Sequence, residues 1–309
     1  MQWGQIKTLF IICFLILDIF LLQQFLKTMD SRSPSGDIAE PKLEEYMKEN
    51  VKGLDKLPEE QVKDSFITVK ARNFTADDVK TLKAMSEQEV DLLGSGNLLY
   101  SEFKEPVPID PDSTKAEKEL ELSEHILSGG EYVYWGKDDA SGALIFFQTN
   151  NSKPIYYSQS GFVVAFVNSD NEITSYLQTA VDEVDRQEPK SMITAYSAIS
   201  SLFKANALPM EDPEITETPT VGYYSFVDLD EGQQVFAPSW HFAINDDLHY
   251  VVMGSEGQFS QHDNPTFVRN TIRKAQDGMR DAKLSDEEIE ELQNVYQRLL
   301  ESTRVSDEE

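Results

Sequence analysis

The chain has 309 residues and is strongly acidic, with 27 Lys and Arg against 55 Asp and Glu and a net charge of −28 at pH 7. This charge argues against binding nucleic acid or adhering to an anionic membrane face, because like charges repel. The hydrophobic content of 40% is enough for one or two packed domains. The single cysteine, Cys13, lies near the N-terminus, so the rest of the chain has no thiol for a disulfide, a redox couple or a nucleophile.

Residues 6–26 form an apolar segment that, as a helix, is about 30 Å long, the thickness of the hydrocarbon core of a bilayer. No small-residue cleavage site follows it, which favours a retained membrane anchor over a signal peptide. Basic residues flank both ends, so the positive-inside rule does not decide the orientation. We place the short tail of residues 1–5 in the cytoplasm and the rest outside, because a long acidic domain can be translocated regardless of its charge.

One acidic residue, Asp18, lies inside this apolar segment. An ionised carboxylate there costs about 2.5–3.5 kcal/mol, and intramembrane ionisable groups are by default functional. We therefore expect the face that carries Asp18 to contact another membrane helix; a protonated or water-reaching aspartate without a partner is the alternative. Helical spacing places these apolar residues on that face: Ile11, Phe14, Leu15, Leu21, Leu22 and Phe25.

The segment 27–41 contains serine, proline and glycine but few large apolar residues, and it predicts a flexible stalk. A helix over 42–49 and a strand over 66–71 are expected to begin the folded part. Thr75 and Asp78 match a capping box, which predicts a helix that ends near Met85.

Glycines and prolines between 94 and 111 predict a loop, and a charged helix over 114–127 follows, closed by Gly129 and Gly130. The chain then changes to aromatic and β-branched runs separated by Asp, Asn, Ser and Gly. This pattern predicts an antiparallel meander. Its expected strands are 132–135, 143–149, 154–158, 162–168 and 172–180.

A helix over 191–205 begins a second unit, followed by strands at 222–228, 233–236, 239–244 and 249–254. The likeness of 154–170 to 238–246 is either a duplicated helix-plus-meander module or a chance similarity of two hairpins. We divide the exported part into subdomains at 42–185 and 186–262 and an acidic helical tail at 263–309. Within the tail, Ser285 and Glu288 form a second capping box, and the helix after them packs on the domain or binds another protein.

No pattern of catalytic or metal-binding residues is present in the sequence. The four histidines lack metal-site spacing, although His241 and His249 can face each other across a hairpin as a polar pair. There is no G-x-S-x-G, P-loop or dinucleotide motif. The acidic residues are too numerous for a glycosidase-like pair to be picked out. We therefore expect no enzyme activity, no cofactor and no metal; a wall-active hydrolase or an extracytoplasmic ligand-binding module are the alternatives.

Two stretches carry a family resemblance. The first comprises KTLFII at 7–12 and LDIFLL at 17–22, and the second runs from GYY at 222–224 to QVFAPSWHF at 234–242. Together, in this order, they resemble the YycI family over roughly residues 1–260. That family consists of single-pass regulators of WalK (YycG), the essential cell-wall sensor histidine kinase of low-GC Gram-positive bacteria. In the second stretch the motif residues are Gly222, Tyr223, Tyr224, Pro238, Trp240, His241 and Phe242.

The resemblance implies an extracytoplasmic α+β fold of helix-plus-antiparallel-sheet units, shared with the partner protein YycH. It also implies regulation without catalysis, in which the membrane helices of this chain and of YycH contact those of the kinase. Asp18 is then expected to hydrogen-bond a polar group on a neighbouring helix, a bond of only about 0.6 kcal/mol on average, so apolar packing must supply much of the affinity. The acidic tail from Asn264 onward departs from the family pattern.

The second motif is expected to specify the fold more than to bind a ligand. In an alternating strand Trp240, Phe242 and Ile244 point to one face, towards the core. His241 then lies on the opposite face with Ala243. Aromatic stripes of this kind usually build cores.

Overall fold

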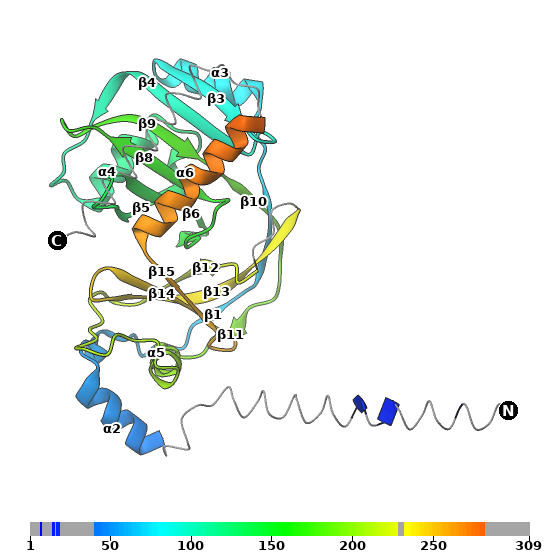
Figure 1. The fold of residues 1–309 in the computed structure, drawn as a ribbon, viewed down its shortest axis with the longest axis vertical. Coiled ribbons are helices and arrows are strands. Elements are labelled where there is room, and N and C mark those ends of the chain that lie inside the picture. The colour runs from blue at the N-terminus through cyan, green and yellow to red at the C-terminus, as the bar shows by residue number, and fades with distance from the viewer. Residues whose placement is uncertain (1–6, 8–13, 16, 19–39, 228–231, 282–309) are drawn as a thin grey trace.

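The computed structural model describes residues 7, 14–15, 17–18, 40–227 and 232–281. Most of the expected membrane segment at 6–26, residues 27–39 of the stalk expected over 27–41, and the helix expected after Ser285 lie outside these residues. The last two residues of the expected stalk belong to α2 (Glu40–Asn50). Within the described part of the chain, no helix has both the length and the apolarity needed to cross a membrane. The folded part contains two large antiparallel sheets with a few helices packed on them and a two-stranded sheet, which confirms the expected α+β class (Figure 1).

The larger sheet has seven strands in the order β3-β4-β9-β8-β6-β5, with β7 paired to β6. Helices cover both of its faces. α6 (Asn264–Asp281) crosses one face diagonally (Figure 1), and α3 (Ala76–Met85) and α4 (Lys115–Ser123) contribute to the core on the other. The strands are β3 (Gln88–Leu93), β4 (Leu98–Pro108), β5 (Tyr132–Lys137), β6 (Leu144–Asn150), β7 (Lys153–Pro154), β8 (Phe162–Val167) and β9 (Glu172–Gln178).

The smaller sheet has six strands in the order β10-β2-β13-β14-β15, with β12 paired to β13. α2 (Glu40–Asn50) and α5 (Ala195–Lys204) pack against it, and Trp240, Phe242 and Ile244 of β13 join their core. The predicted inward face of this strand is therefore confirmed. The strands are β2 (Ile67–Ala71), β10 (Val181–Arg186), β12 (Thr220–Tyr224), β13 (Gln233–Ile244), β14 (Leu248–Met253) and β15 (Phe259–His262).

Short elements complete the fold. β1 (Lys63–Asp64) pairs with β11 (Lys190–Ser191), and two 3-10 helices lie at Leu54–Lys56 and Gly129–Glu131. β2 and β10 belong to the predicted first subdomain, yet they share a sheet with β13 from the predicted second one. The boundary at 185 stays a prediction.

Several local predictions are confirmed by side-chain geometry. Thr75 caps α3 and Thr114 caps α4, and in each case the acidic residue three positions later completes a capping box. The meander formed by β5, β6, β8 and β9 is antiparallel throughout. The helix expected over 114–127 is shorter, because its α-helical part ends at Ser123.

The loop expected around Pro106 and Pro108 is wrong, because β4 runs through Pro108. Proline lacks the N–H that a ladder needs, but it is tolerated at a bulge. β4 and β9 lose register between Glu102 and Val107, and Pro106 lies within this irregularity. Of the strand expected over 154–158, only the first residue, Pro154, lies in a strand, β7.

The strands expected at 233–236 and 239–244 are one continuous strand, β13. The break expected between residues 236 and 239 is a change of partner. Residues 233–236 pair with β2, whereas Ser239–Ile244 pair with β14. Besides β4, the strands that were not predicted are β1, β3, β10, β11 and β15.

Candidate functional site

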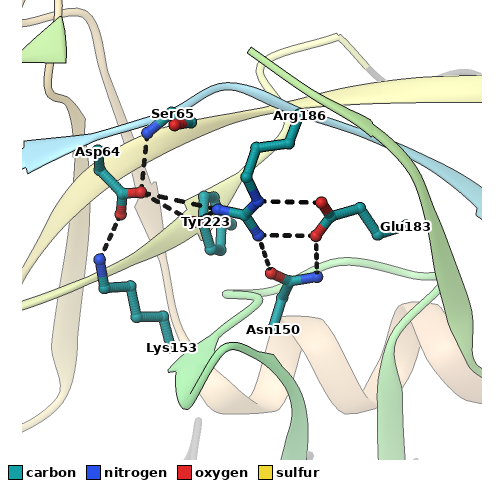
Figure 2. A network of polar contacts seen from close by, with 7 residues as sticks. All are labelled: Asp64, Ser65, Asn150, Lys153, Glu183, Arg186 and Tyr223. Carbon is teal, nitrogen blue, oxygen red and sulfur yellow. Dashed lines mark hydrogen bonds and ion pairs between the residues drawn. The ribbon is translucent and has the colours of Figure 1, made fainter. Parts of the chain in front are cut away.

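A network of charged and polar side chains lies between the two sheets and is centred on Asp64 of β1 (Figure 2). The Asp64 carboxylate is only 7% exposed. Lys153 Nζ contacts its Oδ2 at 2.6 Å, and the Tyr223 hydroxyl donates to Oδ1 at 3.0 Å. The backbone N–H of Ser65 donates to the same oxygen at 2.8 Å. A buried carboxylate is stable only with such partners.

Arg186 of β10 extends this network (Figure 2). Its guanidinium donates to Glu183 through Nε at 2.9 Å and Nη2 at 2.7 Å, a bidentate pair. It also donates to the Tyr223 hydroxyl at 3.0 Å and to the Asn150 side-chain oxygen. The hydrogen bonds to Arg186 lower the pKa of Glu183, and burial raises the pKa of Tyr223 to about 12. Both groups therefore keep one protonation state near neutral pH.

The network connects elements that are far apart in the sequence. Asn150 and Lys153 belong to the β6–β7 turn of the larger sheet, whereas Arg186 and Tyr223 belong to β10 and β12 of the smaller one. Ile155 also forms a parallel bridge with Tyr223. These contacts fix how the two sheets meet.

Gly222, next to Tyr223, explains why the motif begins with glycine. A Cβ at this position would lie 2.3 Å from the carbonyl oxygen of Pro154 and 2.5 Å from the Tyr156 ring. No side chain larger than hydrogen fits without movement of the backbone. This close approach supports the prediction that the motif specifies the fold.

A second cluster between the sheets contains three histidines, one on each of three neighbouring strands. His241, His249 and His262 lie on β13, β14 and β15, and we call them the histidine row. His241 Nε2 and His249 Nδ1 are 3.1 Å apart, and His249 and His262 are paired across β14 and β15. The expected contact of His241 with His249 is therefore confirmed.

Aromatic side chains of the larger sheet cover the histidine row. The Trp135 ring lies 4.5 Å from that of His241 in an edge contact, and Tyr157 stacks on His262 at 4.6 Å. Trp135 Nε1 donates to the Tyr157 hydroxyl at 3.0 Å, which fixes the two rings. His241 therefore faces a second core rather than solvent, and β13 is buried on both faces from Phe236 to Ile244.

Burial lowers the pKa values of all three histidines, and that of His262 falls to about 4. His262 Nε2 is buried and makes no hydrogen bond within the described structure. The row therefore consists of neutral rings at neutral pH. The described residues contain no group of three His, Cys, Asp or Glu side chains arranged to hold a metal ion.

The predicted membrane-helix face is only partly described. Phe14, Leu15 and Asp18 are helical, and the two apolar side chains are 58% and 56% exposed. Ile11, Leu21, Leu22 and Phe25 lie outside the described residues, so the role of this face stays a prediction. Sequence reasoning did not single out Asp64, Arg186 or Trp135. The one signal in the sequence that could have pointed to the Asp64 network is Arg186, the only basic residue of the acidic strand VDEVDR.

Residues 34–254 match the family model described as YycI protein. The chain belongs to the YycI family. This match includes the whole motif from Gly222 to Phe242, the Asp64 network and two members of the histidine row, His241 and His249. YycI proteins are regulatory proteins, and membership supports a regulatory role in the WalK (YycG) system. No curated protein matches the chain.

Two solved structures resemble the fold at low similarity. One is an uncharacterized protein from Eubacterium rectale, with 14% identity and a TM-score of 0.39 over 69% of this chain and 89% of that one. The other is YycH from Bacillus subtilis, with 13% identity and a TM-score of 0.36 over 65% of this chain and 54% of that one.

Proposed function

We propose that this YycI-family chain is a single-pass membrane protein that regulates the sensor histidine kinase WalK (YycG) together with YycH. It acts without catalysis, through contacts between membrane helices. The N-terminus is cytoplasmic and the domain from residue 42 onward is extracytoplasmic. The match of residues 34–254 to the family carries this proposal.

The N-terminal sequence supports the mode of action. Residues 6–26 are long enough as a helix to cross a bilayer, and Asp18 is the only acidic residue among them. Phe14 and Leu15, which share its helical face, are more than half exposed. An apolar face with one polar group suits a partner helix, because packing supplies affinity and the hydrogen bond fixes the register.

The contacts between the two sheets support a non-enzymatic outer domain. The Asp64 carboxylate is held by Lys153 and Tyr223, and the Arg186 guanidinium bonds the same tyrosine and lies 4.0 Å from the carboxylate. The histidine row is covered by Trp135 and Tyr157. These polar groups stabilise the junction of the sheets.

Asp18→Leu tests the contact between membrane helices. We expect weaker co-purification with the kinase from membranes and an altered output of the kinase's regulon, because the polar contact is lost while the segment becomes more apolar. Asp18→Asn keeps a hydrogen-bonding side chain and is expected to retain most of the association. Leu17→Ala, one residue away but off the Asp18 face, is the control. Unchanged association and output in Asp18→Leu would contradict the proposal.

A further inference from the structure

A polar cleft of about 870 Å³ lies between α6 and the ends of strands from both sheets. It is bordered by β2 and the start of β13 on one side and by the β3–β4 turn and residues 159–160 on the other. Figure 1 shows α6 lying across the larger sheet, with β3 near its C-terminal end. The volume lies within the range of about 300–1,000 Å³ that small-molecule sites occupy. The cleft contains none of the residues discussed above.

The sequence of α6 builds one wall. Phe267, Val268 and Ile272 are buried in the core of the larger sheet. The cleft is lined by the opposite stripe, at helical spacings of three, four and seven: Asn270, Arg273, Lys274 and Asp277. Amphipathicity therefore directs a polar face into the cleft.

The charge of the cleft is opposite to that of the chain. Acidic residues outnumber basic ones by 55 to 27 in the chain, but among the described lining residues Lys70, Arg273 and Lys274 stand against one acid, Asp277. Lys70 lies opposite Asp182 on β10, so Arg273 and Lys274 supply most of the positive charge. A cationic cleft on an acidic surface attracts anions locally, while the remaining surface repels them.

The position of Lys274 is fixed within the wall. Its Nζ donates to the backbone carbonyl of Gln159 at 2.8 Å, which joins α6 to the loop on the far side of the cleft. The backbone N–H of Gly94 donates to the carbonyl of Gly278 at 3.3 Å, which joins the same helix to the β3–β4 turn. The cleft walls are therefore held in place without a ligand.

The uncharged lining consists mainly of amides and hydroxyls. A side-chain amide donates and accepts hydrogen bonds, so a ring of amides suits a ligand with many hydroxyls. None of the described lining residues is aromatic, which disfavours a ligand held by ring stacking. The amides are those of Asn73, Asn97, Gln159, Gln234 and Asn270.

We propose that this cleft binds an acidic sugar, a hydroxyl-rich ligand that carries a carboxylate or a phosphate group. Arg273 and Lys274 contact the anionic group, and the amides contact the hydroxyls. This assignment is independent of the membrane-helix contacts proposed above.

The test is ligand-observed NMR on the full chain in a mild detergent, with glucuronic acid, glucose 6-phosphate, glucose and inorganic phosphate as separate probes. We expect either acidic sugar to bind in the millimolar range or tighter, and which one binds identifies the anionic group. Glucose is expected not to bind, and phosphate alone is expected to bind more weakly than glucose 6-phosphate. Three results would overturn the proposal. Glucose binds as tightly as the acidic sugars, or phosphate binds as tightly as glucose 6-phosphate, or neither acidic sugar binds.

Arg273→Gln is expected to lower the affinity about tenfold, the effect of one charge-assisted hydrogen bond. Arg269→Gln makes the same charge change at an exposed position of α6 outside the lining and is expected to leave the affinity unchanged. Asn270→Asp, which adds a carboxylate to the cleft, is a second variant with an expected loss. Equal losses in the Arg273 and Arg269 variants would show only a general charge effect and would contradict the assignment.

Discussion

His262 makes the stability of the junction between the sheets depend on pH. Burial lowers its pKa to about 4; the nearby Asp263 carboxylate opposes this shift, and His249 adds a smaller contribution in the same direction as burial. An unfolded histidine has a pKa of about 6.5. Between these two values the unfolded state binds the proton and the folded state does not, so the free energy of unfolding decreases as the pH falls through this range.

The magnitude follows from the two pKa values. Linkage gives a loss of about 2 kcal/mol from His262 between pH 7.5 and pH 5.0. We expect His262→Phe, which keeps a ring on Tyr157 but cannot titrate, to lack this contribution. His262→Gln tests the same point without the larger ring. Each variant is compared with the wild-type chain at both pH values, so the effect of the many carboxylates is common to all.

The assay is urea unfolding of the full chain in a mild detergent, followed by tryptophan fluorescence. Trp135 contacts His241 and Trp240 is buried in the core of the smaller sheet, so the signal reports on both sides of β13. Urea is uncharged and does not screen the electrostatic effect. The same change in unfolding free energy between pH 7.5 and pH 5.0 in wild type and in both variants would refute the reasoning.

Three further substitutions test the fold by urea unfolding. Arg186→Met is expected to cost about 1.5–3 kcal/mol, because Glu183 and Tyr223 lose a charged hydrogen-bond donor; unchanged stability would contradict a stabilising network. Gly222→Ala is expected to lower the free energy of unfolding by about 1–3 kcal/mol through overpacking. Gly130→Ala is the control, because a Cβ there meets nothing within 4 Å, and it should change stability by less than about 0.5 kcal/mol. Similar values for the two glycine variants would show that the close approach does not matter. Trp240→Ala is expected to cost about 3–5 kcal/mol, and a loss below 1 kcal/mol would be inconsistent with its burial.

Features encoded in a few neighbouring residues could be predicted from the sequence. The capping box of Thr75 and Asp78 needs only a spacing of three, and the alternation of Trp240 and Phe242 needs only the period of a strand. Both are present in the structure. The family motif was likewise readable, because its residues lie within about twenty positions.

Features that depend on tertiary contacts could not be predicted. Asp64 and Tyr223 are separated by 159 residues, and no local pattern links them. The expected loop at Pro106 failed because a bulge in the pairing with β9 accommodates the proline. The cleft could not be predicted for the same reason. In the sequence its wall on α6 is only an amphipathic helix, and the loops that face it are brought there by the tertiary fold.

The most direct test of regulation through membrane helices is an exchange of residues 6–26 for an unrelated membrane segment of equal length, with the output of the kinase's regulon measured in cells. The outer domain is left intact, and its correct export is checked by protease accessibility. We predict that regulation is lost although the outer domain is exported and folded. Wild-type output from the exchanged chain would contradict a role for the membrane helix.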